Sequence, residues 1–267
     1  MGHIICIASQ KGGVGKTTTA INLSAALAVA EKETLLVDCD PQGHATTGMG
    51  IDKKNLKKTL SHGMMGNATL EELIMDSDLD FLKTLPACIE LFHTEVELMS
   101  KPGKEEILRN LLSDLKETYD YIIIDSPPSL RLLTVNAVSA ADSLLIPLQC
   151  EFYALEGLGQ LLQSIQILKK RFNPDIKIAG ILLTMFAMGE EASRQIAEDA
   201  RNHFNDMVFK TVIPRNVQLR ESASYGKPLL LQDIMSVGAR SYLELAREII
   251  DQAPVFRSTN LADQAGS

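Results

Sequence analysis

A glycine-rich loop near the start of the chain carries the clearest chemistry in this sequence. Residues 11–17 read Lys-Gly-Gly-Val-Gly-Lys-Thr, after an apolar run at 4–8 and at the start of a helical pattern. The glycines let successive backbone N–H groups turn toward one anion, Lys16 can reach the β and γ phosphates of a nucleotide, and the Thr17 hydroxyl can ligate Mg²⁺. The loop therefore predicts a nucleoside triphosphate site formed by Gly12, Gly13, Val14, Gly15, Lys16, Thr17 and Thr18.

The loop departs from the common G-x-x-x-x-G-K-[ST] pattern at its first position. Gln10 stands where that pattern has a glycine, and a second lysine, Lys11, lies five residues before Lys16. A solvated lysine in a flexible connection is the plain alternative for Lys11. Binding of a nucleotide by one chain does not by itself explain the presence of Lys11.

Two further apolar runs end in aspartates. One ends at Asp38 and Asp40, before a proline and a glycine that force a turn, and the other ends at Asp125, before two prolines. In isolation such aspartates are often turn formers or helix caps. Beside a phosphate loop, Asp40 is predicted to orient the attacking water, and Asp125 is predicted to hold Mg²⁺ together with Thr17.

The elements that must position these groups alternate along the chain. Apolar runs predict buried parallel strands at 4–9, 34–38, 121–125, 143–148, 178–185 and 208–213. Helical patterns lie at 16–30, 104–118, 132–141, 154–171, 191–204 and 236–252. This order predicts an α/β fold, a doubly wound and mostly parallel sheet with helices on both faces and the ligand at the carboxyl ends of the strands.

We expect a single domain over residues 1–252. Residues 50–105 read as an irregular insertion within it, with helices at 70–75 and 89–99 and a short strand at 81–85. The segment 253–267 is rich in small and polar residues and is predicted to be a disordered tail.

Composition excludes several classes of protein. The chain has 267 residues, 45% of them hydrophobic, and a formal net charge of −8. Overall charge therefore argues against a protein that coats nucleic acid, and any such contact needs a local basic patch. No run of about 18 apolar residues and no secretory signal is evident, so we expect a cytoplasmic protein.

Taken together, the motifs resemble the deviant-Walker P-loop ATPases of the ParA/Soj and MinD superfamily, and ParA/Soj most closely. The resemblance spans residues 4 to about 250. Besides the glycine-rich loop and the two aspartate motifs, it rests on the segments 149–157, 182–185 and 212–217. It implies a Mg²⁺-dependent ATPase that acts in chromosome or plasmid partitioning.

The resemblance also implies an ATP-bound sandwich homodimer. In such a dimer Lys11 of one subunit would reach the phosphates held by the other, which makes Lys11 catalytic together with Lys16 and Asp40. Gly12 and Gly13 leave room for the partner's backbone there. The adenine would be lined by Met185, Pro214 and Asn216, although Met185 could equally be ordinary core packing.

For partners, the resemblance implies nonspecific DNA binding by the ATP dimer and a ParB/Spo0J-like activator whose basic segment stimulates hydrolysis. DNA binding would associate the protein with the nucleoid. Relatives are expected to carry arginines where this chain has Gly189 and Gln218. The basic residues that remain nearby are Arg194, Lys210, Arg215, Arg220, Lys227 and Arg240.

Two alternative functions remain open for a protein of this fold. The first is a ParA/MinD-like ATPase that positions another cargo or acts as a regulator with weak or no DNA binding. MinD-like proteins attach to membranes through a basic amphipathic helix, and the segment after Gln252 has only one basic residue, Arg257, so we expect no membrane attachment of that kind. The second is a metabolic ligase or a reductase.

The four cysteines bear on the reductase alternative. Cys6, Cys39, Cys88 and Cys150 are far apart and form no C-x-x-C pair, so reduced and buried thiols are expected. The related nitrogenase iron protein holds an iron–sulfur cluster with two cysteines per subunit. Neither Cys88 nor Cys150 lies in a glycine-rich ligand segment, which argues against such a cluster.

Overall fold

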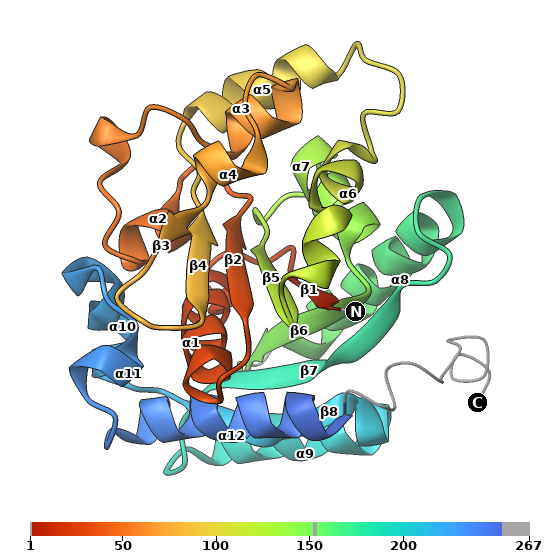
Figure 1. The fold of residues 1–267 in the computed structure, drawn as a ribbon. Helices are drawn as coiled ribbons and strands as arrows, with labels where there is room; N and C mark the ends of the chain where they lie inside the picture. Colours follow the sequence, from red (N-terminus) through yellow and green to blue (C-terminus); the bar gives the residue numbers. More distant parts are fainter. Residues whose placement is uncertain (1, 152–153, 253–267) are drawn as a thin grey trace.

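One eight-stranded sheet organises the chain (Figure 1). The computed structural model describes residues 2–151 and 154–252, so the predicted disordered tail lies outside it. The strand order is β3-β4-β2-β5-β1-β6-β7-β8, and every neighbouring pair is parallel except β3 with β4. The strands are β1 (His3–Ile7), β2 (Thr34–Asp38), β3 (Met75–Asp76), β4 (Leu82–Leu85), β5 (Tyr121–Asp125), β6 (Ser143–Gln149), β7 (Lys177–Phe186) and β8 (Val208–Pro214).

Helices cover both faces of the sheet, and each face has its own apolar core. One face packs against α3 (Leu60–Met65), α4 (Leu70–Leu73), α5 (Glu90–Leu98), α6 (Ile107–Leu112), α7 (Leu132–Ala140), α8 (Ala154–Arg171) and α9 (Glu191–Phe204). The other packs against α1 (Lys16–Val29), α2 (His44–Gly48), α10 (Val217–Ser222), α11 (Leu229–Gln232) and α12 (Val237–Gln252). The predicted doubly wound α/β fold is confirmed.

Two sequence predictions need correction. The expected helix at 104–118 is divided into α6 and a 3₁₀ turn, η2 (Asp114–Glu117). At the division the Ser113 hydroxyl bonds the Asn110 carbonyl and the Asp114 carboxylate, and such local bonds compete with helix continuation. The segment 50–105 is also more regular than expected, because its strand β4 pairs in parallel with β2 inside the main sheet.

The remaining short elements connect these layers. They are the 3₁₀ turns η1 (Lys53–Asn55), η3 (Asn205–Met207) and η4 (Ala223–Tyr225). In the described part of the chain, no helix is long and apolar enough to cross a membrane. Cys6, Cys39 and Cys150 are buried free thiols, whereas Cys88 is half-buried. Among the described residues no group of three or more His, Cys, Asp or Glu could hold a metal ion.

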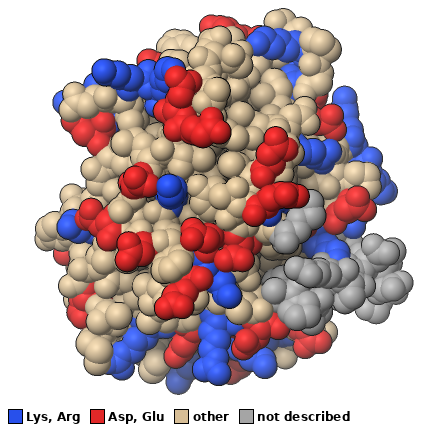
Figure 2. Space-filling model, viewed as in Figure 1, with Lys and Arg blue, Asp and Glu red and all other residues tan. Residues whose placement is uncertain are grey.

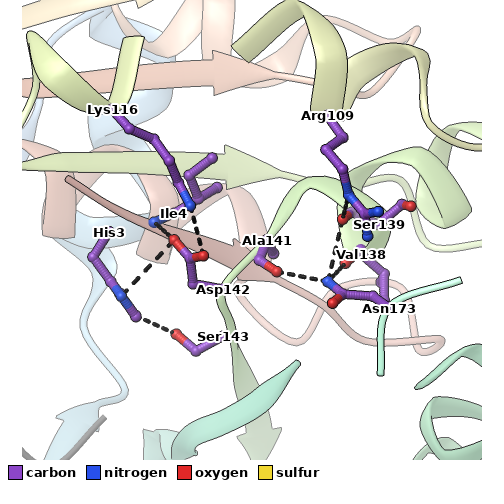
Figure 3. A network of polar contacts seen from close by, with 10 residues as sticks. All are labelled: His3, Ile4, Arg109, Lys116, Val138, Ser139, Ala141, Asp142, Ser143 and Asn173. Carbon is purple, nitrogen blue, oxygen red and sulfur yellow. Dashed lines mark hydrogen bonds and ion pairs between the residues drawn. The ribbon is translucent and has the colours of Figure 1, made fainter. Parts of the chain in front are cut away.

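A polar cluster ties the strands together at their amino ends (Figure 3). The Asp142 carboxylate accepts the backbone N–H of Ile4 at 2.8 Å and the Lys116 ammonium at 2.7 Å. His3 bonds the Ser143 hydroxyl at 2.8 Å and lies 3.9 Å from Asp142. These contacts join the starts of β1 and β6, and they leave the opposite, carboxyl edge of the sheet to the candidate site.

Candidate nucleotide site

The glycine-rich loop connects β1 to α1 at the carboxyl edge of the sheet. Gly15 caps α1 at φ 93°, a left-handed conformation that side chains with a Cβ rarely adopt. The Thr184 hydroxyl, near the end of β7, donates to the Val14 carbonyl at 2.9 Å and so anchors the loop to a strand two places from β1 in the sheet. The strand, loop and helix predicted for phosphate binding therefore lie as expected.

Lys16 is a buried cation within this loop. Its side chain is 7% exposed, and its ammonium donates to the Lys11 carbonyl at 3.0 Å. Burial lowers the pKa of Lys16, whereas the charges of Asp125 and Asp40 act to raise it. A buried ammonium at the start of α1, close to the charges of Asp125 and Asp40, is suited to holding phosphate oxygens.

Asp125 ends β5 fully buried, and neither of its carboxylate oxygens has a partner within hydrogen-bond distance and angle among the described residues, although the Thr17 hydroxyl lies close enough to lower its pKa. Burial raises the pKa of Asp125 well above its usual range, and the charge of Asp38 adds to this, while the Thr17 hydroxyl and Lys16 lower it. An unpartnered buried carboxylate is costly unless a cation binds it. Asp125 with Thr17 therefore fits a Mg²⁺ site by its chemistry.

The two aspartates after β2 have different surroundings. Asp38 is fully buried and accepts the backbone N–H and the hydroxyl of Thr46, both at 2.7 Å, and the N–H of Asp40 at 3.1 Å. Burial raises the pKa of Asp38 to about 6. Asp40 instead lines the main cavity, with one oxygen accepting the N–H of Gln42 at 2.9 Å. The geometry makes Asp38 an organiser of the loop and leaves Asp40 beside the nucleotide space.

The turn that carries Asp40 is closely packed. Gly43 donates its N–H to the Asp40 carbonyl at 2.8 Å and has φ 60°. A Cβ added at Gly43 would lie 2.6 Å from the Ala87 carbonyl oxygen. The Ala87 N–H in turn donates to the Thr46 hydroxyl at 2.9 Å. Residues after β4 therefore hold the Asp40 turn, which local sequence could not indicate.

Two of the cavities beside the loop contain the residues predicted for nucleotide binding. The main cavity, about 620 Å³, is lined by residues of the loop, the Asp40 turn, Pro127 to Ser129, Arg131, Leu133, Phe92, Glu95 and Met185. The second, about 350 Å³, is lined by Gly15, Thr18, Thr184, Met185, Ile213, Pro214, Arg215, Asn216, Val217, Leu219 and Tyr242. The residues predicted to surround the adenine thus share one cavity next to the phosphate loop.

Met185 connects the two cavities, because it lines both. It is half-buried and has φ 52°, a conformation that is strained for a residue other than glycine. This placement favours a ligand-facing residue over ordinary core packing. The contact with the base itself stays a prediction.

Lys11 is placed differently from Lys16. It is exposed and lines a separate hollow beside α8, not the main cavity. Its ammonium lies 3.3 Å from the Glu151 carboxylate, in a pair whose side chains are about half exposed. Within one chain Lys11 therefore lies outside the main cavity, in an ion pair with Glu151.

The sequence reasoning missed Glu95 and Phe92, which line the main cavity from α5. Glu95 is 8% exposed, and its carboxylate accepts the Leu133 N–H, in the first turn of α7, at 3.2 Å. The spacing of Leu91, Glu95 and Leu98 at i, i+4 and i+7 was the available signal, since it places the glutamate on the buried face of the helix.

In the region suggested for DNA contacts, three of the five described basic side chains are in ion pairs, whereas Lys210 and Arg240 are exposed and in none of the ion pairs found there. Arg194 pairs with Glu191, Arg215 lies 3.4 Å from Glu190, and Lys227 lies 3.1 Å from Asp78. Gln218 donates to the Asp233 carboxylate at 3.2 Å. The Arg220 side chain lies outside the described part of the structure. On the face drawn in Figure 2, acidic and basic side chains are interspersed.

Comparisons with known proteins agree with this geometry. The model of the AAA domain family matches residues 2–178. A chromosome partitioning protein ParA from Myxococcus xanthus strain DK1622 is 52% identical over 250 residues, which cover 94% of this chain and 88% of that protein. The sporulation initiation inhibitor protein Soj from Bacillus subtilis strain 168 is 48% identical over 249 residues, which cover 93% of this chain and 98% of that protein.

Among solved structures, cobyrinic acid a,c-diamide synthase from Mycobacterium smegmatis, with bound ATP analog and magnesium, has a TM-score of 0.84. The identity is 33%, and the match covers 95% of this chain and 96% of that chain. The shared fold thus extends to a protein named as a synthase. Sequence identity is higher with the two proteins named above.

Proposed function

The chain belongs to the ParA/Soj family of partitioning ATPases, and on this premise we propose that it binds Mg²⁺-ATP, dimerises around it and is released from the dimer by hydrolysis. The observation that carries the proposal is the unpartnered, buried carboxylate of Asp125 beside Lys16 at the phosphate loop. Lys16 lines the main cavity and Asp125 is buried near it, so the two groups would supply a phosphate contact and a cation ligand close together.

In the proposed reaction the residues of one chain have different roles. The loop N–H groups and Lys16 hold the phosphates, and the Asp40 carboxylate orients a water toward the γ phosphate. Thr17 and Asp125 would hold Mg²⁺, which when bound neutralises charge on the phosphates. In the dimer the Lys11 ammonium would leave the Glu151 carboxylate and contact the phosphates of the nucleotide bound by the partner subunit.

We further propose that the ATP dimer attaches nonspecifically to DNA in the cytoplasm, at the nucleoid, and that a ParB-like protein stimulates hydrolysis. The family supports this function. The second candidate is positioning of another cargo with weak or no DNA binding. It is favoured by Gly189, by Gln218 and by the ion pairs of Arg194, Arg215 and Lys227.

The experiment that tests the catalytic proposal is Asp40→Ala. The variant should bind ATP with the affinity of the wild type and should dimerise, because the phosphate clamp remains. Single-turnover hydrolysis should fall by about 10²-fold or more, since the group that orients the water is lost. Asp175→Ala, which removes an exposed carboxylate between α8 and β7, is the matched control. Hydrolysis by Asp40→Ala at the wild-type rate would assign the role to another group.

A further inference from the structure

Arg131 is a second cationic side chain of the main cavity, besides Lys16. It lies directly before α7 and caps the amino end of that helix with an extended backbone. Its side chain is exposed and lines the main cavity together with Lys16 and Asp40. Among the described residues around this cavity, Lys16 and Arg131 are the only lysine and arginine.

The guanidinium of Arg131 has no hydrogen-bond or ion-pair partner among the described residues. By contrast, Lys16, Asp40 and Glu95, which line the same cavity, each have a hydrogen bond within the chain. Arginine keeps its charge at any physiological pH and presents five N–H donors in a planar fork. This guanidinium is therefore available to an anion that enters the cavity.

Contacts on both sides of Arg131 hold the backbone from which its side chain projects. The Thr134 hydroxyl, in the first turn of α7, donates to the Ser129 carbonyl and lies 3.4 Å from the Pro127 carbonyl oxygen. The Val135 N–H donates to the Arg131 carbonyl at 3.0 Å. Because the backbone is already held, an anion that meets the guanidinium does not have to order the loop first.

The position of Arg131 in the chain favours one phosphate of a bound nucleotide. The loop that ends at Arg131 begins at Asp125, which is proposed to hold Mg²⁺. Metal ions at phosphoryl-transfer sites bridge the β and γ phosphates. The loop thus starts on the γ-phosphate side of the proposed site, and its last residue lines the same cavity as Lys16.

We propose that the Arg131 guanidinium contacts the γ phosphate of the ATP held by its own chain and is a further catalytic residue. The proposal rests on the proposed function in requiring ATP in the main cavity. Lys16 reaches the β and γ phosphates and so also holds ADP, whereas Arg131 would recognise the γ phosphate alone. In the transition state, charge spreads over the oxygens of the transferred phosphoryl group, where a fork of N–H donors stabilises it.

The test compares Arg131→Ala with the wild type by calorimetry against a non-hydrolysed ATP analogue and against ADP. Affinity for the analogue should fall about tenfold, because a charge-assisted contact is lost, whereas affinity for ADP should change less than about twofold. Arg131→Lys keeps the charge without the fork and should lie between the two proteins. Arg247→Ala, which removes an 86% exposed arginine from α12, is the matched control and should bind both nucleotides like the wild type.

A Lys11→Ala background separates the chain's own nucleotide from that of a partner subunit. This change is expected to weaken the ATP dimer, and sedimentation identifies the concentrations at which single chains bind the analogue. Adding Arg131→Ala under those conditions should still reduce affinity for the analogue about tenfold. A loss of affinity that appears only in the dimer would place the Arg131 contact across the interface and overturn the proposal.

Single-turnover hydrolysis gives a second measurement. At saturating ATP, Arg131→Ala should hydrolyse ATP about tenfold more slowly or worse. Thermal unfolding should show an intact fold, because the side chain is exposed. Arg131→Ala with the wild-type ratio of the two affinities, or with wild-type hydrolysis, overturns the proposal and leaves the proposed function standing. A wild type that binds neither nucleotide overturns both.

Discussion

At the scale of single residues, three carboxylates close to the phosphate loop have three different environments. Asp38 is hydrogen-bonded to Thr46, Asp40 lines the cavity, and Asp125 is buried without a partner. These environments support the proposed roles: Asp38 organises the loop, Asp40 would orient the attacking water, and Asp125 would bind a cation. Three identical side chains near the phosphate loop thus have different surroundings.

Lys11 gives the prediction at this scale. Lys11→Ala should bind ATP as the wild type does, because the residue does not line the main cavity, but its ATP dimer should dissociate about tenfold more readily, as expected when a charge-assisted contact is lost. Calorimetry and analytical ultracentrifugation measure the two quantities. Lys57→Ala, at an exposed position, is the control. A Lys11→Ala dimer as stable as that of the wild type would remove Lys11 from the interface.

At the scale of elements, distant side chains hold the helices that flank the site. Asn173, before β7, donates its amide to the carbonyls of Val138, Ser139 and Ala141 at 2.9, 3.2 and 2.8 Å (Figure 3). Arg109 adds a bond to the Ser139 carbonyl at 2.7 Å. These donors satisfy carbonyls at the end of α7, which have no partner inside the helix. The first turn of α7 is held by Glu95, so both of its ends are set by other elements.

Asn173 gives the prediction at this scale. The residue is 7% exposed, so Asn173→Ala leaves buried carbonyls without a donor and should lower the free energy of unfolding by about 2 kcal/mol. Urea denaturation measures the loss. Asn202→Ala on the exposed surface of α9 should change stability by less than about 0.5 kcal/mol. If the two variants were equally stable, the cap would contribute little.

At the scale of the whole molecule, charge decides which surface the protein can attach to. A net charge of −8 repels DNA, and three of the nearby basic residues, Arg194, Arg215 and Lys227, are already in ion pairs. Dimerisation doubles the number of basic side chains that are available to contact DNA. We therefore expect DNA binding that depends on ATP, lacks sequence preference and weakens steeply with salt.

Two substitutions test this expectation. A Cβ added at Gly189 meets no atom within 4 Å, so Gly189→Arg fits sterically, and Gln218→Arg restores the second expected arginine. In an Asp40→Ala background with ATP, the double change should strengthen binding to random duplex. It should also steepen the salt dependence by about 0.9 per new phosphate contact. Gly189→Gln with Gln218→Asn is the uncharged control. No ATP-dependent binding by either protein at micromolar concentration would favour attachment to another surface.

The sequence by itself determined the phosphate loop, the aspartates at the strand ends and the doubly wound α/β fold. Loop chemistry is local, and buried parallel strands read as continuous apolar runs, so neither needs distant partners. The roles assigned to Lys16, Asp40 and Asp125 remain predictions, as does the single domain over 1–252.

Only the tertiary structure decided which of these residues meet. It separated Asp38 from Asp40 through Thr46, placed β4 beside β2, buried Glu95 against α7 and paired Lys11 with Glu151. Each of these facts depends on a contact with a residue outside the local motif. Residues separated along the chain are brought together by packing of the whole sheet and its helices. Short-range sequence patterns do not specify which distant residues come into contact.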